Sequence, residues 1–265
     1  MTAAAIPSSR ALDLLRAARD RYGRSPEDWV TAALGDVEGP VVELRCAPSS
    51  PTSRIVLRRM TVGGAPGDGV ACGGVQCGGS LDGGVLDGGA LDGGALDGGV
   101  LGRPEQLPVR TNAVAGVRAT MCLPVLEGLD QLFAELRRVL RPTGTLVALV
   151  PSRPGGPLTT PRAWRPLNRA LAGHPGFRHA SARDHLGWLF TAADFAVLTD
   201  QRRAFWVPVP DEISAARVVA GLVPAGIWPP DVEPERLRRA ESGLARYAAP
   251  DRRLPIPLRM LVGRR

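Results

Sequence analysis

The histidines are the first side chains to consider for acid–base chemistry, because imidazole titrates near neutral pH. The chain has three of them, His174, His179 and His185. His185 directly follows Asp184, so this pair is the best candidate for a general base with a neighbouring carboxylate. A partly exposed histidine with a purely structural role fits the same pattern, and both interpretations stay open.

The four cysteines do not indicate a metal centre. They are Cys46, Cys72, Cys77 and Cys122. Four residues separate Cys72 from Cys77, but no second pair and no histidine cluster completes a metal site. A disulfide framework is not expected in a chain of 265 residues without signs of secretion. We therefore expect no bound metal and structural cysteines.

The charge of the chain is strongly positive, at +7, yet its basic residues are all arginines. Alanine, glycine and proline are also abundant, which is typical of GC-rich coding sequences such as those of actinobacteria. The arginines are scattered and are not interleaved with aromatic residues, as a nucleic-acid surface would require. No apolar run reaches the roughly 18 residues that cross a bilayer, and the N-terminus lacks the pattern of a secretory signal. We expect a soluble, cytoplasmic protein without nucleic-acid or membrane partners.

A helix followed by a buried strand is predicted from Gln131 to Ser152, which reads QLFAELRRVLRPTGTLVALVPS. Apolar residues recur there at spacings of three and four up to Leu140, as in an amphipathic helix. Pro142 prevents the helix from continuing, and Thr145–Val150 is an apolar run of strand length. A helix that leads into such a strand is a unit of a doubly wound α/β sheet.

This segment resembles the helix and fifth strand of class I S-adenosylmethionine-dependent methyltransferases of the type 11-like group. The match is to the family line ELxRVLRPGGxLVLxxP. The resemblance implies one Rossmann-like, doubly wound domain over residues 1–265, with a mostly parallel sheet and an antiparallel C-terminal strand. It also implies S-adenosylmethionine as the cofactor.

The resemblance places the cofactor loop after the first strand, in residues 39–62. The family has an acidic residue, an apolar residue and then GxGxG, and Glu43 and Leu44 match the first two positions. Arg45, Ala47 and Ser49 stand at the three glycine positions. Glycine avoids a collision with a ligand on the backbone, so the Arg45 side chain enters the methionine space of the cofactor unless it turns to solvent or to Glu43. Lost affinity and a shifted backbone that still binds both stay open.

A glycine-rich tract occupies residues 63–102, where Leu-Asp-Gly-Gly repeats with a period of five residues. Its repeated acidic residues are Asp82, Asp87, Asp92 and Asp97. Glycine costs backbone entropy and few bulky side chains repay it, so we expect a flexible insertion. Calcium binding and a small β-helix are alternatives to an expansion without function, which we favour. The tract takes the place of the second and third strands, and Asp68 is the only candidate for the family's ribose contact.

The resemblance resumes in residues 103–152, which hold the predicted core strands four and five. Glu105, Gln106 and Leu107 match the family segment beside the adenine, so the resemblance makes them cofactor contacts. Arg103 and Ala115 replace acidic residues of the family pattern. Residues 153–265 correspond to the substrate cover and the last strands.

The outer elements are predicted from caps and periodicity. We expect N-terminal helices over 9–22 and 26–34, further helices over 160–172, 182–189, 211–222 and 234–247, and strands within 195–207 and 256–262. The helix pair on either side of Trp228 could cap a pocket or form a dimer surface, and Trp206 and Trp228 could line an apolar site or belong to the core.

Two functions fit these patterns. The first is S-adenosylmethionine-dependent methyl transfer to a small-molecule acceptor. The second is a non-catalytic, methyltransferase-like protein that binds a protein partner or an altered ligand. Nucleic-acid methylation lacks a target-recognition domain, and a homodimer stays open.

Overall fold

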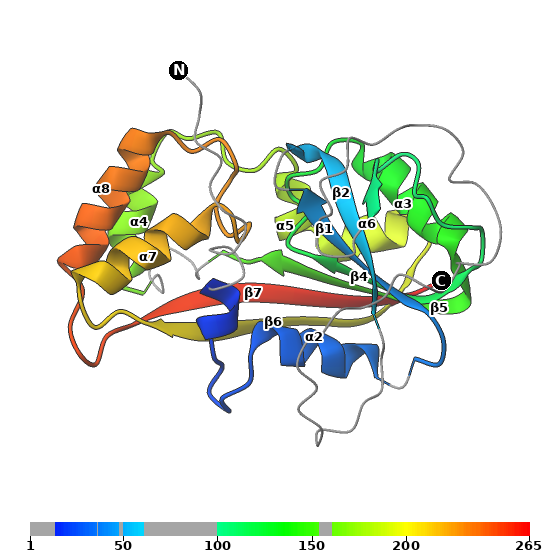
Figure 1. The fold of residues 1–265 in the computed structure, drawn as a ribbon, viewed down its shortest axis with the longest axis horizontal. Coiled ribbons are helices and arrows are strands. Elements are labelled where there is room, and N and C mark those ends of the chain that lie inside the picture. The colour runs from blue at the N-terminus through cyan, green and yellow to red at the C-terminus, as the bar shows by residue number, and fades with distance from the viewer. Residues whose placement is uncertain (1–13, 36, 48–49, 61–99, 154–160) are drawn as a thin grey trace.

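The computed structural model describes residues 14–35, 37–47, 50–60, 100–153 and 161–265. Its described strands form one sheet in the order β3-β2-β1-β4-β5-β7-β6 (Figure 1). The strands are β1 (Val41–Ala47), β2 (Ser50–Met60), β3 (Val100–Gly102), β4 (Val114–Thr120), β5 (Leu140–Pro151), β6 (Ala196–Pro208) and β7 (Arg253–Arg264). The helices are α2 (Pro26–Leu34), α3 (Leu129–Val139), α4 (Trp164–Ala170), α5 (Ala180–Asp184), α6 (Leu186–Ala192), α7 (Glu212–Leu222) and α8 (Pro234–Ala245).

Most of the strands point the same way. Strand β4 is parallel to both β1 and β5, whereas β7 is antiparallel to its neighbours β5 and β6. Strand β2 is antiparallel to β1 and β3. Within the described chain, only β2 and β7 are therefore reversed. The expected α/β, Rossmann-like architecture with an antiparallel C-terminal strand is confirmed.

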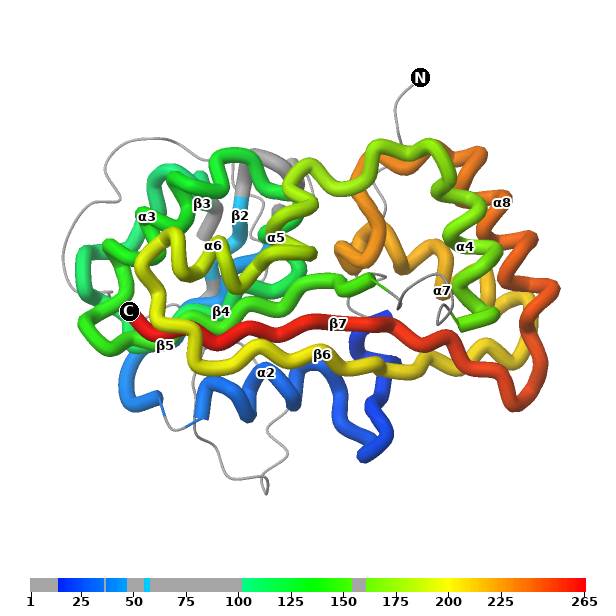
Figure 2. The backbone as a smooth tube through the Cα atoms, turned by 180° about the vertical axis from the view of Figure 1, so that it is seen from behind, coloured from blue at the N-terminus to red at the C-terminus, as the bar shows by residue number. Residues whose placement is uncertain are grey.

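Helices cover both faces of the sheet. Alternate residues of β5 enter two separate cores, with Val147 and Leu149 on one face and Leu146, Ala148 and Val150 on the other. The first core includes residues of α2, α4, α7 and α8, and the second includes residues of α3, α5 and α6. Figure 2 shows the second group from its own side of the sheet. An apolar strand buried on both faces is what a doubly wound sheet requires.

Local signals predict several elements correctly. Ser25 caps α2, because its hydroxyl accepts from the Asp28 N–H while the Asp28 carboxylate accepts from the Ser25 N–H. Helix α3 ends at Val139, before Pro142, as predicted. Asp211 caps α7 through the Ser214 N–H. Strands β6 and β7 and helices α7 and α8 also lie where the sequence indicates.

The predicted helix over 9–22 is wrong in its second half. Residues 14–17 are helical, and residues 1–13 lie outside the described part of the chain. Arg19 instead pairs with Trp206 through two backbone hydrogen bonds, of 3.1 and 2.6 Å. The Asp20 carboxylate then accepts from the N–H groups of Tyr22 and Arg24 and forms a turn. Residues 19–22 therefore pair with β6 or form a turn, although their apolar periodicity predicted a helix.

The predicted helix over 182–189 is two helices, α5 and α6, which meet at His185.

The glycine-rich tract does not replace the second and third strands, because β2 and β3 occupy both positions in the sheet. However, β1 and β2 form an antiparallel pair with only residues 48 and 49 between them. No helix can therefore follow β1. The Leu-Asp-Gly-Gly repeats and Asp68 lie outside the described residues.

Candidate functional site

The candidate site lies at the middle of β1 and in the carboxyl-terminal half of β4. Glu43 of β1 and Arg118 of β4 are register partners in the parallel pair. Both residues are buried, at 4% and 2% exposure. Burial of a charged side chain is costly unless the side chain is paired and hydrogen-bonded. Glu43 and Arg118 can therefore be buried only because they pair with each other.

Three donors converge on one oxygen of Glu43. Its Oε1 atom lies 3.1 Å from Arg118 Nε and 3.0 Å from Arg45 Nη2. The Thr120 hydroxyl donates to the same oxygen over 3.2 Å and accepts from Arg118 Nε over 3.1 Å. The Arg45 side chain therefore turns towards Glu43, one of the two directions that the sequence left open.

Helix α2 adds a fourth charged group to this cluster. Glu27 Oε1 lies 3.7 Å from Arg118 Nη1, from a side chain that is mostly exposed. Arg118 Nη1 and Arg45 Nε are buried and have no hydrogen-bond partner among the residues that the structure describes. Two guanidinium groups thus face two carboxylates, and we call Glu27, Glu43, Arg45 and Arg118 the β1–β4 charge cluster.

The loop after α7 packs on the carboxyl end of β4. Gly226 has a φ of +69°, and a Cβ atom at this residue would lie 2.7 Å from the Met121 carbonyl oxygen. Trp228 follows in the same loop and is only 1% exposed. Figure 1 shows α4, α7 and α8 grouped at the end of the sheet towards which β6 points. Trp228 belongs to the core, and this helical group covers the carboxyl end of the sheet.

The residues of the β1–β4 charge cluster do not fit S-adenosylmethionine. The methionine end of this cofactor carries a sulfonium and an ammonium group, both positive, together with one carboxylate, so it is a net cation. Arg45 and Arg118 would place two further cations there, and the Glu43 carboxylate oxygen that could compensate already accepts from three donors. Leu44 is fully buried and faces the α3 side of the sheet. The Ala47 side chain and all of Ser49 lie outside the described residues.

The predicted adenine contacts are divided between surface and core. Glu105 and Gln106 are exposed, and Leu107 is buried at 3%. The Leu107 N–H donates to Glu135 over 2.8 Å, and its carbonyl accepts from Arg138 over 3.0 Å. Glu135 and Arg138 are themselves an ion pair on α3. The N–H and the carbonyl group of Leu107 are therefore both hydrogen-bonded to side chains of α3.

Asp184 and His185 are adjacent in space but are not hydrogen-bonded to each other in the described chain. Asp184 is paired with Arg183 at 3.0 Å and with Arg153 at 2.9 Å, whereas His185 is exposed. Partial burial raises the pKa of Asp184, but the hydrogen bond and charge of Arg183 outweigh it and leave this pKa below its usual value. The Asp184 carboxylate is therefore bound to two arginines and not to His185.

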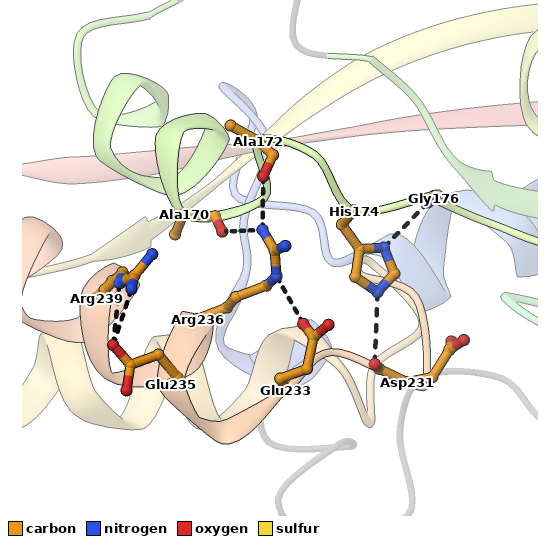
Figure 3. A network of polar contacts seen from close by, with 9 residues as sticks. All are labelled: Ala170, Ala172, His174, Gly176, Asp231, Glu233, Glu235, Arg236 and Arg239. Atoms are coloured by element: carbon orange, nitrogen blue, oxygen red, sulfur yellow. Dashed lines mark hydrogen bonds and ion pairs between the residues drawn. The ribbon is translucent and has the colours of Figure 1, made fainter.

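A further polar network joins α4 to α8 (Figure 3). Arg236 donates to the carbonyl oxygens of Ala170 and Ala172, over 3.0 and 2.7 Å, and pairs with Glu233 at 2.6 Å. His174 Nδ1 accepts from the Gly176 N–H over 3.0 Å, so His174 is part of a loop that this network supports. Basic side chains at a helix C-terminus satisfy its last carbonyl groups. Arg236 and Arg118 were not singled out by sequence, which carries no signal for such long-range partners.

Cys46, near the end of β1, and Cys122, just after β4, lie close together. Cys46 Sγ is 3.8 Å from the Cys122 carbonyl oxygen, and Cys122 Sγ is 3.8 Å from that of Leu44. Burial raises the pKa of Cys122 to about 12 and raises that of Cys46 well above its usual value.

Within the described ranges, no group of three or more His, Cys, Asp or Glu residues could hold a metal ion. No described helix has the length and hydropathy to cross a membrane.

Comparisons with known proteins show that the fold of this chain is distantly similar to that of several solved structures. No protein-family model matches the chain, and no curated protein sequence matches it. Among solved structures it is similar to the YcgJ protein from Bacillus subtilis, with 15% identity over 62% of this chain and 69% of that chain and a TM-score of 0.39. It is also similar to the [4+2]-cyclase SpnF, with 19% identity over 61% and 53% and a TM-score of 0.36.

A third similar structure is geranyl diphosphate C-methyltransferase from Streptomyces coelicolor A3(2), in complex with Mg²⁺, geranyl diphosphate and S-adenosyl-L-homocysteine. Identity is 13% over 62% of this chain and 51% of that chain, with a TM-score of 0.32. This chain thus spans about half the length of SpnF and of the geranyl diphosphate enzyme. These values describe fold alone, so functional conclusions rest on the residues of this chain.

Proposed function

We propose that this chain is a non-catalytic, methyltransferase-like protein that acts by binding a protein partner or a ligand other than S-adenosylmethionine. One observation carries the proposal, namely the β1–β4 charge cluster. The acidic residue that matches the family's cofactor motif is buried in an ion pair with Arg118, and Arg45 closes on it from the glycine position. A fold of this kind hosts many functions, and function has to be read from the site.

The path of the chain after β1 supports the same proposal. Only two residues separate β1 from β2, and the two strands are paired from Val41–Met60 to Cys46–Ile55, with a register shift before the last pair, Ala47–Ser50. A helix that starts just after a strand offers free N–H groups to a ligand at the carboxyl edge of the sheet. This chain has no room for such a helix after β1. A ligand at this position would lack both the glycine turn and the helix N-terminus.

The second candidate is S-adenosylmethionine-dependent methyl transfer to a small-molecule acceptor. Strands β1, β4 and β5 are parallel neighbours, so their carboxyl ends lie together where open α/β sheets bind ligands. Glu43 also keeps the acidic position of the motif. In that case His185, which is exposed beside Asp184, would be the candidate base.

Calorimetric titration with S-adenosylhomocysteine separates the two candidates. We expect no binding heat up to millimolar ligand, together with a cooperative thermal transition that shows the protein to be folded. Dissociation constants in the micromolar range would reject the non-catalytic proposal in favour of the enzyme. The melting temperature with and without ligand gives an independent measurement, because a ligand that binds the native state raises it.

A further inference from the structure

Strand β6 is the outer strand of the sheet, and most of its free edge is uncovered in the described chain. The bridge between Arg19 and Trp206 is the pairing that this edge makes among the described residues. Residues 196–198 and 200–202 are exposed. A long free edge presents unpaired N–H and C=O groups and is a template for another strand.

A groove of about 440 Å³ lies along this edge. Its walls are Asp20, Arg21 and Tyr22 on one side and β6 on the other, as far as Trp206. Tyr22 is 65% exposed beside the groove, and Val197 and Leu198, at the start of β6, are 40% and 50% exposed. Strand β6 therefore begins with exposed apolar residues, and the groove lined by Tyr22 lies near its other end.

We propose that a second copy of this chain pairs with β6 along the free edge, antiparallel and centred on Gln201. A two-fold interface brings the same patch of both copies together, so the patch must complement itself. An antiparallel arrangement centred on Gln201 places the apolar start of one strand opposite the groove of the other copy. Thr199 of one copy then lies opposite Arg203 of the other, and an irregularity in β6 between Val197 and Thr199 ends the regular register there.

The backbone of β6 is compatible with this register. Trp206 exchanges both hydrogen bonds with Arg19, so its N–H and C=O face outwards. In an antiparallel pair alternate residues share this orientation, and the pairing of β6 with β7 is regular from Thr199 to Pro208. Ala204, Arg202 and Asp200 therefore also face outwards. Centring on Gln201 pairs Asp200 with Arg202 of the second copy, and both are outward-facing residues.

Charge then selects this register over its two nearest alternatives. Pairing centred on Asp200 or on Arg202 would place two like charges directly opposite each other, which is unfavourable. Pairing centred on Gln201 places opposite charges together at two symmetric positions. Arg202 makes no ion pair with the described residues, whereas Asp200 binds Arg259 of β7 at 2.7 Å and keeps capacity for another donor.

The length of the strand also fits. Strand β6 begins at Ala196, after a turn in which Asp194 has a φ of +57°. In the proposed register Ala196 of the second copy reaches Trp206, where Arg19 already occupies the edge. Because Arg19 holds this position, the pairing between the two copies stops before it and covers residues 199–203.

Sedimentation equilibrium of charge variants tests the proposal. We expect wild-type protein to dimerise at micromolar concentrations, and Arg202→Asp and Asp200→Arg each to weaken dimerisation at least about tenfold through like-charge repulsion. An equimolar mixture of the two variants should restore a dimer, because every opposed pair is again of opposite charge. Circular dichroism confirms folding, since Asp200→Arg also removes the ion pair with Arg259.

A crosslink gives a second readout that does not depend on the charges. Gln201→Cys should form a disulfide between the two copies under mild oxidation, because opposed residues at the centre of the pairing lie close together. Mass spectrometry identifies the 201–201 linkage, and Asp251→Cys at an exposed turn is the matched control. A monomeric wild type, a dimer that neither charge variant weakens, or a β6 edge that binds another protein in place of a second copy would overturn the proposal.

Discussion

Arg118 Nε lies 3.1 Å from Glu43 Oε1, which joins β4 to β1 by an ion pair between two buried side chains. Removal of one partner leaves the other charge buried, so Arg118→Met should lower the free energy of unfolding by about 3 kcal/mol. Adding Glu43→Gln should recover a large part of this loss. Urea unfolding of both single variants and the double variant measures the coupling.

Arg45→Met is the matched control, because the Arg45 side chain is 28% exposed. We expect it to cost less than about 1 kcal/mol, as solvent screens a partly exposed pair. If Arg118→Met and Glu43→Gln were additive in the double variant, the two residues would not be energetically coupled.

Restoring the glycines should not restore cofactor binding. Arg45→Gly, Ala47→Gly and Ser49→Gly together would recreate the motif, but β1 would still lead directly into β2. We expect calorimetry with S-adenosylhomocysteine to show no binding by this triple variant, with Arg110→Gly as the control for loss of an exposed arginine. Micromolar binding would show that the three side chains alone block the site.

Stability should depend on pH through Asp20. Burial raises the pKa of this carboxyl, but hydrogen bonds from Arg24, Tyr22 and Arg203 outweigh it and hold the pKa below its usual value. The unfolded state therefore takes up this proton first as the pH falls. The contribution of Asp20 is complete above about pH 4 to 5 and is lost as the pH falls through the folded-state pKa.

Asp20→Asn should lower the free energy of unfolding by about 1 to 3 kcal/mol at neutral pH and flatten its decline below about pH 4. Thermal or urea unfolding as a function of pH measures both effects. Asp251→Asn, at an exposed carboxylate without an ion pair among the described residues, is the control. Parallel pH profiles for wild type and Asp20→Asn would exclude Asp20 as the titrating group.

The thiols of Cys46 and Cys122 should be unreactive in the native protein. Their raised pKa values leave almost no thiolate near neutral pH, and Cys122 is fully buried. N-ethylmaleimide should label neither residue in the folded protein and both in guanidinium chloride, as measured by mass spectrometry of the peptides. Rapid labelling of native Cys46 would indicate that the end of β1 opens to solvent.

The elements that have local signals could be predicted from the order of the amino acids alone. Ser25 and Asp28 are three residues apart and form the capping box that starts α2, and Pro142 requires α3 to end before it. The continuous apolar run of β5 likewise required burial on both faces, and hence an α/β fold. Each signal depends on residues close together in the chain, so no tertiary information was needed.

The pairing of the strands and their directions depend on long-range contacts and could not be predicted in this way. The sequence predicted an N-terminal helix through Arg19, but Trp206, far along the chain, takes both of its backbone hydrogen bonds. Likewise, nothing local indicated that β2 would return antiparallel to β1, or that Arg118 would meet Glu43. These contacts join segments that are distant in sequence, and their energy exists only when the whole sheet has formed.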